Sequence, residues 1–290
     1  MAKKINIALF GFGRIGRNLF RLGYDNPKYN FVAISDFGSS EALHYLLARD
    51  SIHGSMDDDV RLDGNHLIVK NQRSRLINGG EPGNVPWDAF DVDVVVDATG
   101  RFLKREELAA HLRAGAKRVF ISRNPHDTID RFVIPGINEK SIETTDQIIS
   151  TTSSTTQVLA LMVKMLDEKF GLERAMMTTV HAYTADQPLA DAAGVDLRRS
   201  RSAVENIIPN STRAPKIVTD IMPEYKGKID GIAFNVPVPN GSCVDLTTEL
   251  KNVPSIDEAN QTIKEYSMES LNGIVGYTSD PIVSSDVIGR

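Results

Sequence analysis

Residues 5–16 read INIALFGFGRIG, a short apolar run followed by three glycines in the pattern G-x-G-x-x-G. The apolar run predicts a buried strand, and residues 14–24 have the apolar spacing of a helix. Between a strand and a helix, Gly11 and Gly13 allow a tight turn and a close approach to pyrophosphate, and Gly16 lets the two elements pack closely. The phosphates would lie at the helix N-terminus, where unpaired N–H groups favour an anion. The stretch therefore predicts a dinucleotide-binding turn.

Asp36 makes that prediction more specific. It ends a second predicted strand, residues 31–35, and lies twenty residues after Gly16. A carboxylate at this place accepts a hydrogen bond from a ribose 2′-hydroxyl and repels a 2′-phosphate. The sequence therefore predicts NAD as the cofactor, in preference to NADP.

Predicted strands and helices alternate over the first 150 residues. Such alternation is typical of the α/β class with a Rossmann-type doubly wound sheet, and we expect this NAD-binding domain over residues 1–152. The predicted helices are 14–24, 41–48 and 105–114, and the predicted strands are 4–9, 31–35, 66–70, 74–77, 92–97, 118–122, 132–134 and 147–150.

The pattern changes after Ser153. A predicted helix over 159–170 is followed by strands over 174–183, 231–238 and 242–250, with an irregular stretch over 184–212. Strands grouped apart from helices predict an α+β domain with a mainly antiparallel sheet. This second, catalytic-type domain is expected over residues 153–290.

Composition excludes several classes of protein. The 290 residues carry a net charge of −5 without a block of either sign, so neither nucleic-acid nor membrane binding is expected. The single cysteine, Cys243, excludes an intrachain disulfide. No leader is recognised and no apolar run reaches membrane-spanning length, so the cytoplasm is the expected compartment. The acidic run 57–59 lacks further carboxylates spaced to complete a site, so no metal is expected.

A hydroxyl-rich segment, residues 150–158, opens the predicted helix of the second domain. Unpaired N–H groups and the macrodipole at a helix N-terminus favour an anion, so an enzyme would place an activated nucleophile there. His181, in the run 178–184, is the candidate partner base.

Several longer segments carry a family resemblance: residues 7–17, 49–54, 94–100, 179–184, 206–209 and 283–286. Through them the whole chain resembles phosphorylating glyceraldehyde-3-phosphate dehydrogenase. The resemblance implies a Rossmann domain, a catalytic domain that begins at the nucleophile, NAD, and a homotetramer. It also implies the glycolytic reaction, in which a cysteine thiolate attacks the aldehyde, hydride passes to NAD and inorganic phosphate releases the acyl group.

The resemblance also implies roles for single residues. Ser154 occupies the position of the nucleophile and His181 that of the general base. The implied cofactor contacts are Gly11, Gly13, Arg14, Ile15, Gly16, Asp36, Thr99 and Ser122. The implied substrate and phosphate contacts are Ser153, Thr155, Thr184, Thr212, Arg213 and Asn235.

Four departures from the family pattern change the expected chemistry. Ser154 replaces a cysteine, and an alcohol is far less acidic than a thiol, whose pKa is about 8.5. Asn235 replaces the arginine that holds the substrate phosphate, which removes a charge-assisted contact of about 1.5–3 kcal/mol. Arg213 replaces a glycine and either blocks the anion pocket or supplies a replacement cation. Residues 157–158 read Gln-Val in place of Asn-Cys, which indicates natural divergence beyond one exchanged atom.

Three hypotheses stay open from the sequence. The first is an NAD-binding homologue that has lost most or all phosphorylating dehydrogenase activity, a pseudoenzyme. The second is an active NAD-dependent oxidoreductase for another aldehyde, with Ser154 as acyl acceptor or His181 activating water. The third is a non-catalytic binding or regulatory subunit, in a homo-oligomer or in assembly with a full-length relative.

The end of the sequence carries one more expectation. The resemblance runs through residues 283–289 and stops at Arg290, whereas the family implies a further strand, an asparagine that orients the nicotinamide, and a final helix. We therefore expect a truncated second domain with an open sheet edge and exposed apolar surface.

Overall fold

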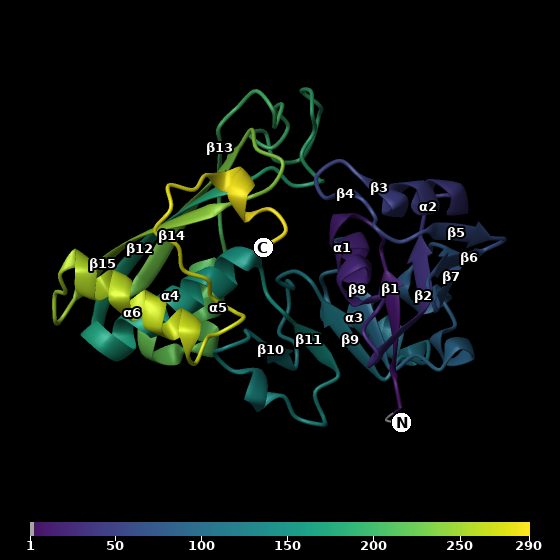
Figure 1. Ribbon diagram of the computed structural model, residues 1–290, viewed down its shortest axis with the longest axis horizontal. Helices are drawn as coiled ribbons and strands as arrows, with labels where there is room; N and C mark the ends of the chain where they lie inside the picture. The colour runs from purple at the N-terminus through teal and green to yellow at the C-terminus, as the bar shows by residue number, and fades with distance from the viewer. Residues whose placement is uncertain (1–2) are drawn as a thin grey trace. The chain divides into compact units, whose positions relative to one another are not determined.

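The chain is described by a computed structural model covering residues 3–290, and it divides into two compact units. The N-terminal unit comprises the residues up to Val133 together with Lys140–Thr152. The C-terminal unit comprises Ile134–Glu139 together with Ser153–Arg290. Figure 1 shows the elements of both units by label.

The N-terminal unit is built on one sheet with the strand order β10-β11-β9-β8-β1-β2-β7-β6-β5. Neighbouring strands are parallel from β10 to β7, and the hairpin strands at the other end pair antiparallel. The expected doubly wound sheet is confirmed. Its strands are β1 (Ile5–Phe10), β2 (Tyr29–Asp36), β5 (Val60–Asp63), β6 (His66–Val69), β7 (Gln72–Asn78), β8 (Val94–Asp97), β9 (Arg118–Ile121), β10 (Arg131–Phe132) and β11 (Ile148–Ser150).

Helices and one small strand pair complete this unit. They are α1 (Arg14–Gly23), α2 (Ser40–Ala48), α3 (Arg105–Arg113), β3 (Arg49–Asp50) and β4 (Gly54–Ser55). Aromatic rings fix α1 to the sheet, because Phe20 packs edge-on to Phe12 and tilted against Phe31 of β2. The strand order reverses at β1, with β2 on one side and β8 on the other. Ligands of such sheets bind beyond the carboxyl ends of the strands at this switch point.

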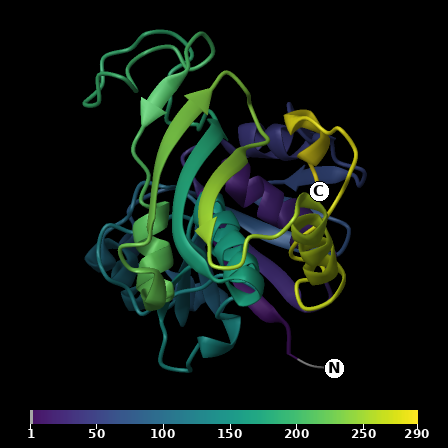
Figure 2. The same cartoon turned by 90° about the vertical axis from the view of Figure 1, so that its left-hand side faces the viewer.

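The C-terminal unit holds a second sheet in the order β13-β14-β12-β15, with helix α4 behind its strands in Figure 2. The outer pairs are antiparallel and the central pair, β12 with β14, is parallel. Residues Leu159, Ala160 and Val163 of α4 pack on Ala175 and Met177 of β12. The elements are α4 (Ser154–Phe170), β12 (Leu172–Ala182), β13 (Ile208–Asn210), α5 (Ala214–Ile221), β14 (Ile229–Val236), β15 (Cys243–Leu250) and α6 (Ile256–Met268).

Several elements differ from expectation, among them α4, β13 and the unexpected helices α5 and α6. Helix α4 begins at Ser154 and not at Leu159, because the Ser153 hydroxyl accepts a hydrogen bond from the Thr156 N–H at 3.2 Å and caps the first turn. Strand β13 lies inside the stretch expected to be irregular, where it pairs with β14. Across residues 3–290, the helices are all too short or too polar to cross a membrane.

A largely buried ion pair supports the glycine turn from outside. The Arg17 guanidinium lies 3.1 Å from an Asp50 carboxylate oxygen and donates to the Phe12 carbonyl, also at 3.1 Å. The second Asp50 oxygen accepts the N–H groups of Ile52 and His53, each at 3.0 Å. Burial raises the pKa of Asp50, but these N–H donors and Arg17 outweigh burial and lower the pKa to about 2.

We expect this carboxylate to make the N-terminal unit acid-sensitive. Its pKa of about 2 when folded lies below the unfolded value of about 3.9, so its stabilisation is complete above about pH 5 and is lost as the pH falls toward 2. Asp50→Asn should cost about 2–3 kcal/mol of unfolding free energy at pH 7 and less at pH 3. Urea unfolding followed by Trp87 emission at both pH values checks this. Asp25→Asn, at an exposed ion pair with Lys70, is the control; equal losses in both variants would contradict the prediction.

Candidate functional site

The three glycines of the turn have different surroundings. Gly11 has a φ of +95°, and a Cβ there would lie 2.8 Å from the Thr99 nitrogen. A Cβ on Gly16 would lie 2.2 Å from the Gly11 carbonyl oxygen. A Cβ on Gly13 would meet no atom within 4 Å. Gly11 and Gly16 are therefore required by close backbone packing, whereas Gly13 faces open space at the start of α1.

Asp36 is held at the edge of this space by the backbone. One carboxylate oxygen accepts the Phe12 N–H at 2.7 Å, and the other accepts the Gly38 N–H at 2.9 Å. Each carboxylate oxygen has about two acceptor positions, so both keep one for a ribose hydroxyl. Asp36 lines a cavity of about 170 Å³ together with Phe10, Gly11, Gly13, Thr99 and Arg101. An open glycine turn and a fixed carboxylate in one cavity fit a dinucleotide.

The other expected cofactor contacts lie in the same unit. Thr99 donates from its N–H and its hydroxyl to one oxygen of Asp97, at 2.9 and 2.6 Å. The Ser122 hydroxyl donates to the Asp97 carbonyl at 3.4 Å, so both residues lie at the carboxyl end of β8. Arg14 and Ile15 form the first turn of α1, and Ile15 is 51% exposed.

Two residues of this cavity were not expected from the sequence. The Phe37 side chain is 59% exposed, and the Arg101 guanidinium stacks over its ring at 5.2 Å from the centroid. Both residues line the cavity. The sequence could have indicated Phe37, because its ring directly follows the predicted ribose-binding Asp36. The contact between Phe37 and Arg101 could not be predicted, because it depends on the tertiary fold.

The charge of Asp36 should determine the choice between NAD and NADP. Asp36→Asn removes the charge and turns one acceptor into a donor that faces a backbone N–H. We expect NAD to bind about tenfold more weakly, and the ratio of NAD to NADP affinity to fall at least tenfold. Calorimetric titration with both nucleotides measures this, with Asp25→Asn as the control for a surface charge. An unchanged ratio of NAD to NADP affinity would show that Asp36 does not contact the ribose 2′-hydroxyl.

The expected nucleophile position opens the C-terminal unit. Ser154 is the first residue of α4 and is exposed, directly after the capping Ser153. Within residues 3–290, the Ser154 hydroxyl makes no hydrogen bond to another protein group, including His181. The part of the chain that the structure describes gives Ser154 the N-terminus of α4 but no ion-paired group that would ionise an alcohol.

His181 lies on β12 with one ring nitrogen held by the backbone. Its Nδ1 is 2.7 Å from the Ala182 carbonyl oxygen. Because a carbonyl only accepts, Nδ1 carries the proton, and in the neutral ring Nε2 keeps its lone pair. This is the tautomer that a general base requires.

Asn235 is brought directly beside His181. The two residues pair in register across β12 and β14, and the Asn235 side chain donates to the same Ala182 carbonyl at 3.2 Å. Its oxygen accepts from the Asn210 amide at 3.1 Å, and the residue is only 6% exposed. The position is therefore occupied by a neutral, hydrogen-bonded amide that brings no positive charge.

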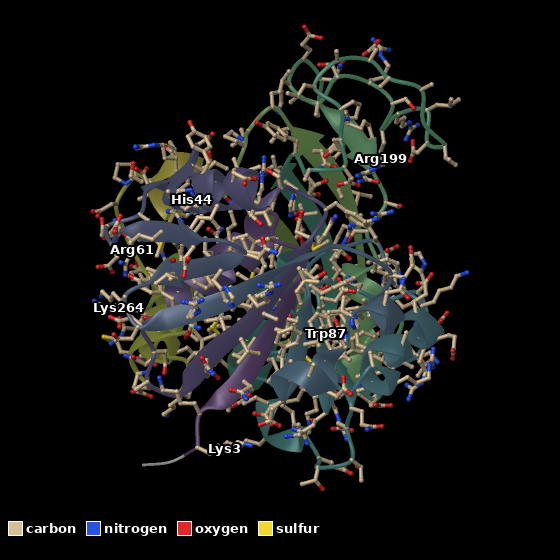
Figure 3. The ribbon with its side chains drawn as sticks, turned by 90° about the vertical axis from the view of Figure 1, so that its right-hand side faces the viewer. Lys3, His44, Arg61, Trp87, Arg199 and Lys264 are labelled. Atoms are coloured by element: carbon tan, nitrogen blue, oxygen red, sulfur yellow. The ribbon has the colours of Figure 1, made fainter. Side chains whose placement is uncertain are left out.

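Two of the remaining expected phosphate contacts, Thr184 and Thr212, have protein partners. The Thr184 hydroxyl donates to Asp186 at 2.5 Å, and Arg199, labelled in Figure 3, pairs with the other oxygen of that carboxylate. The Thr212 hydroxyl accepts from the Ala214 N–H at 3.2 Å. Thr155 is buried in α4, and Arg213 is exposed immediately before α5. Thr184 thus lies beside a carboxylate, which disfavours a second anion.

Other features of the described chain do not add to this site. A larger hollow of about 490 Å³ in the C-terminal unit, lined by parts of β12, β14 and β15, contains none of the expected site residues. Among residues 3–290, no three His, Cys, Asp or Glu side chains are grouped to hold a metal ion.

The glycine turn, the fixed Asp36 and the switch point define a dinucleotide-binding protein of the doubly wound class. Residues 5–105 match the family model "Glyceraldehyde 3-phosphate dehydrogenase, NAD binding domain", and residues 153–290 match "Glyceraldehyde 3-phosphate dehydrogenase, C-terminal domain". The chain belongs to the glyceraldehyde-3-phosphate dehydrogenase family, and its cofactor is NAD.

Curated relatives are similar along nearly the whole chain. It is 43% identical to glyceraldehyde-3-phosphate dehydrogenase 1 of Bacillus subtilis over 287 residues, which cover 99% of this chain and 85% of the relative. It is also 43% identical to glyceraldehyde-3-phosphate dehydrogenase of Geobacillus stearothermophilus, over 98% of this chain and 85% of that relative.

Proposed function

We propose that the chain is an NAD-binding glyceraldehyde-3-phosphate dehydrogenase homologue whose phosphorylating activity is lost or strongly reduced. The observation that carries the proposal is Ser154 at the first residue of α4, where the family reaction uses a cysteine thiolate. The dinucleotide cavity of the N-terminal unit supports retained cofactor binding.

A serine nucleophile slows both stages of the reaction, the attack on the aldehyde and the release of the acyl group to phosphate. NAD, when bound, supplies the acceptor for a hydride from the aldehyde carbon. A helix N-terminus beside a histidine lowers a thiol pKa into the working range, but an alcohol is too weak an acid to be ionised by the same means. His181 can take the hydroxyl proton during attack, as in serine hydrolases. That attack gives a hemiacetal, and once its hydride has passed to NAD the remaining oxyester is a poorer acyl donor to phosphate than a thioester, so release of the acyl group is slow as well.

The substrate side is weakened independently. In place of a guanidinium, Asn235 offers a neutral amide, one of whose two N–H donors is already given to the Ala182 carbonyl. Loss of a charge-assisted hydrogen bond lowers affinity for a phosphorylated substrate by roughly ten- to a hundredfold. A phosphorylated aldehyde is therefore expected to bind weakly, in addition to reacting slowly with Ser154.

Two measurements on the unaltered chain test this proposal. Calorimetry should show NAD binding at micromolar to millimolar concentration. An absorbance assay with NAD, phosphate and glyceraldehyde 3-phosphate should show turnover at least about a hundredfold below that of the Bacillus subtilis relative, assayed alongside. No binding at millimolar NAD would refute the retained cofactor site, and turnover equal to the relative would refute the loss of activity.

The tautomer of His181 favours a second candidate, an NAD-dependent oxidoreductase for a non-phosphorylated aldehyde. Its unprotonated Nε2 suits activation of Ser154 or of water. A screen of short aldehydes with NAD should then give reduced cofactor. His181→Ala should abolish this turnover whichever group is activated, and Ser154→Ala should abolish it where Ser154 is the acyl acceptor. Turnover that survives both substitutions would exclude this candidate.

We further propose a cytoplasmic oligomer, either of identical chains or with a full-length relative. Met176 and Ile232 lie on the sheet face that does not contribute to the α4 core and are each partly exposed. Light scattering of the purified chain, alone and mixed with a relative, measures the assembly. A monomer in both samples would contradict it.

A further inference from the structure

The chain has one tryptophan, Trp87, which is labelled in Figure 3 and is fully buried in the N-terminal unit. Its indole Nε1–H donates to Nδ1 of His111 at 3.0 Å. An indole nitrogen only donates, so Nδ1 accepts and the proton of the neutral imidazole lies on Nε2. The Phe10 ring packs edge-on to the same imidazole at 4.6 Å. Trp87 therefore fixes both the tautomer and the orientation of His111.

The protonated nitrogen of His111 faces a buried carboxylate. His111 Nε2 lies 3.7 Å from Asp97 Oδ2, and both side chains are almost fully buried. Within residues 3–290, neither atom has a hydrogen-bond partner. The separation exceeds a normal N–H···O bond by less than about 1 Å, so a small shift of the carboxylate completes the bond.

The second oxygen of Asp97 acts on the dinucleotide cavity. Oδ1 accepts both the N–H and the hydroxyl of Thr99, and Thr99 lines the cavity. The Thr99 backbone also packs so closely on Gly11 that a Cβ there would lie 2.8 Å from its nitrogen. Asp97 thus connects the buried imidazole to the wall of the cavity beside the glycine turn.

We propose that His111 is a positioning residue for the cofactor. Its orientation is fixed by Trp87, its N–H steadies the Asp97 carboxylate, and Asp97 places Thr99 against Gly11. This role depends on the NAD binding that the proposed function assigns to the chain. Trp87, His111 and Asp97 do not themselves line the cavity. The positioning role predicts that changes at His111 alter NAD affinity beyond their effect on stability.

Three variants separate positioning from simple packing. His111→Leu puts an apolar side chain in the place of the imidazole and removes both polar contacts, and we expect NAD to bind roughly tenfold more weakly. His111→Gln keeps an acceptor for Trp87 and a donor for Asp97, so it should bind NAD within about threefold of the unaltered chain. Leu108→Ala, a fully buried position on the same helix, should lower Tm with unchanged NAD affinity.

The readouts are the NAD dissociation constant by calorimetry, Tm, and Trp87 emission. Adding NAD should change the emission of the unaltered chain, and His111→Leu should diminish that change. Trp87→Phe, which removes the donor that fixes the tautomer, provides a second affinity test should His111→Leu not fold; a loss of roughly threefold is expected.

The outcomes distinguish this inference from the proposed function. No NAD binding by the unaltered chain refutes both. Normal NAD binding that persists unchanged in His111→Leu and Trp87→Phe refutes the positioning role alone. An equal loss of affinity in Leu108→Ala assigns the effect to general destabilisation and also overturns it.

Discussion

Ser154→Cys is expected to create a thiol that reacts with iodoacetamide at least about tenfold faster than Cys243. Both positions are exposed, but Ser154 begins a seventeen-residue helix whereas Cys243 begins a strand. A helix N-terminus lowers a thiol pKa by one unit or more, which raises the thiolate fraction near neutral pH about tenfold per unit. The comparison uses two single-thiol proteins: Cys243→Ser with Ser154→Cys, and the unaltered chain.

The same substitution should restore measurable reduction of NAD by glyceraldehyde 3-phosphate, because a thiolate attacks the aldehyde and the thioester left after hydride transfer is a better acyl donor than an oxyester. Adding Asn235→Arg should lower KM for the phosphorylated substrate by about ten- to a hundredfold, with a smaller effect on a non-phosphorylated aldehyde. Ser154→Ala is the inactive control. If the thiol introduced by Ser154→Cys alkylates no faster than Cys243, this helix end does not activate a nucleophile.

Gly16→Ala is expected to disrupt the N-terminal unit, whereas Gly13→Ala should leave it folded and impair only NAD binding. The added Cβ at Gly16 meets a backbone oxygen at 2.2 Å, and neither α1 nor β1 can move without breaking the core around Phe12. Overpacking of this kind costs about 1–3 kcal/mol, and more where backbone must shift. Urea unfolding followed by Trp87 emission measures the loss.

Gly13 provides the matched comparison. Its φ of −73° suits alanine, and its Cβ would enter open space, so stability should change by less than about 0.5 kcal/mol. NAD affinity should fall at least about tenfold, because the methyl group occupies the approach of the pyrophosphate. Equal stability in both variants, or unchanged NAD binding by Gly13→Ala, would contradict the assignment of the turn.

The N-terminal unit was largely predictable because its signals are local. A strand, three glycines, a helix and Asp36 follow each other within 32 residues, from Ile5 to Asp36, and each constrains the next. The start of α4 was predicted wrongly because helix propensity disfavours a run of Ser and Thr, whereas the Ser153 cap stabilises the first turn there.

The surroundings of the candidate site were not predictable in the same way. The side chain of Asn235 bonds to residues 25 and 53 positions away, which only the pairing of β13, β14 and β12 brings together. The Trp87–His111 bond spans 24 residues and depends on how α3 packs over the sheet. Sequence spacing indicated the candidate site residues. The hydrogen-bond partners that orient their side chains could not be predicted, because they depend on tertiary contacts.

The six residues Ile134–Glu139 give the chain an unusual path. Ile134 is buried in the core of the C-terminal unit with Leu159 and Ala160, and a Cβ on Gly136 would meet Leu271 at 2.7 Å. This peptide is synthesised before β11, which is the last strand of the N-terminal sheet in chain order. It is also synthesised before every other part of the core of the C-terminal unit. It has to remain exposed until α4 is made. Each unit is compact, yet no single cut of the backbone releases either one whole.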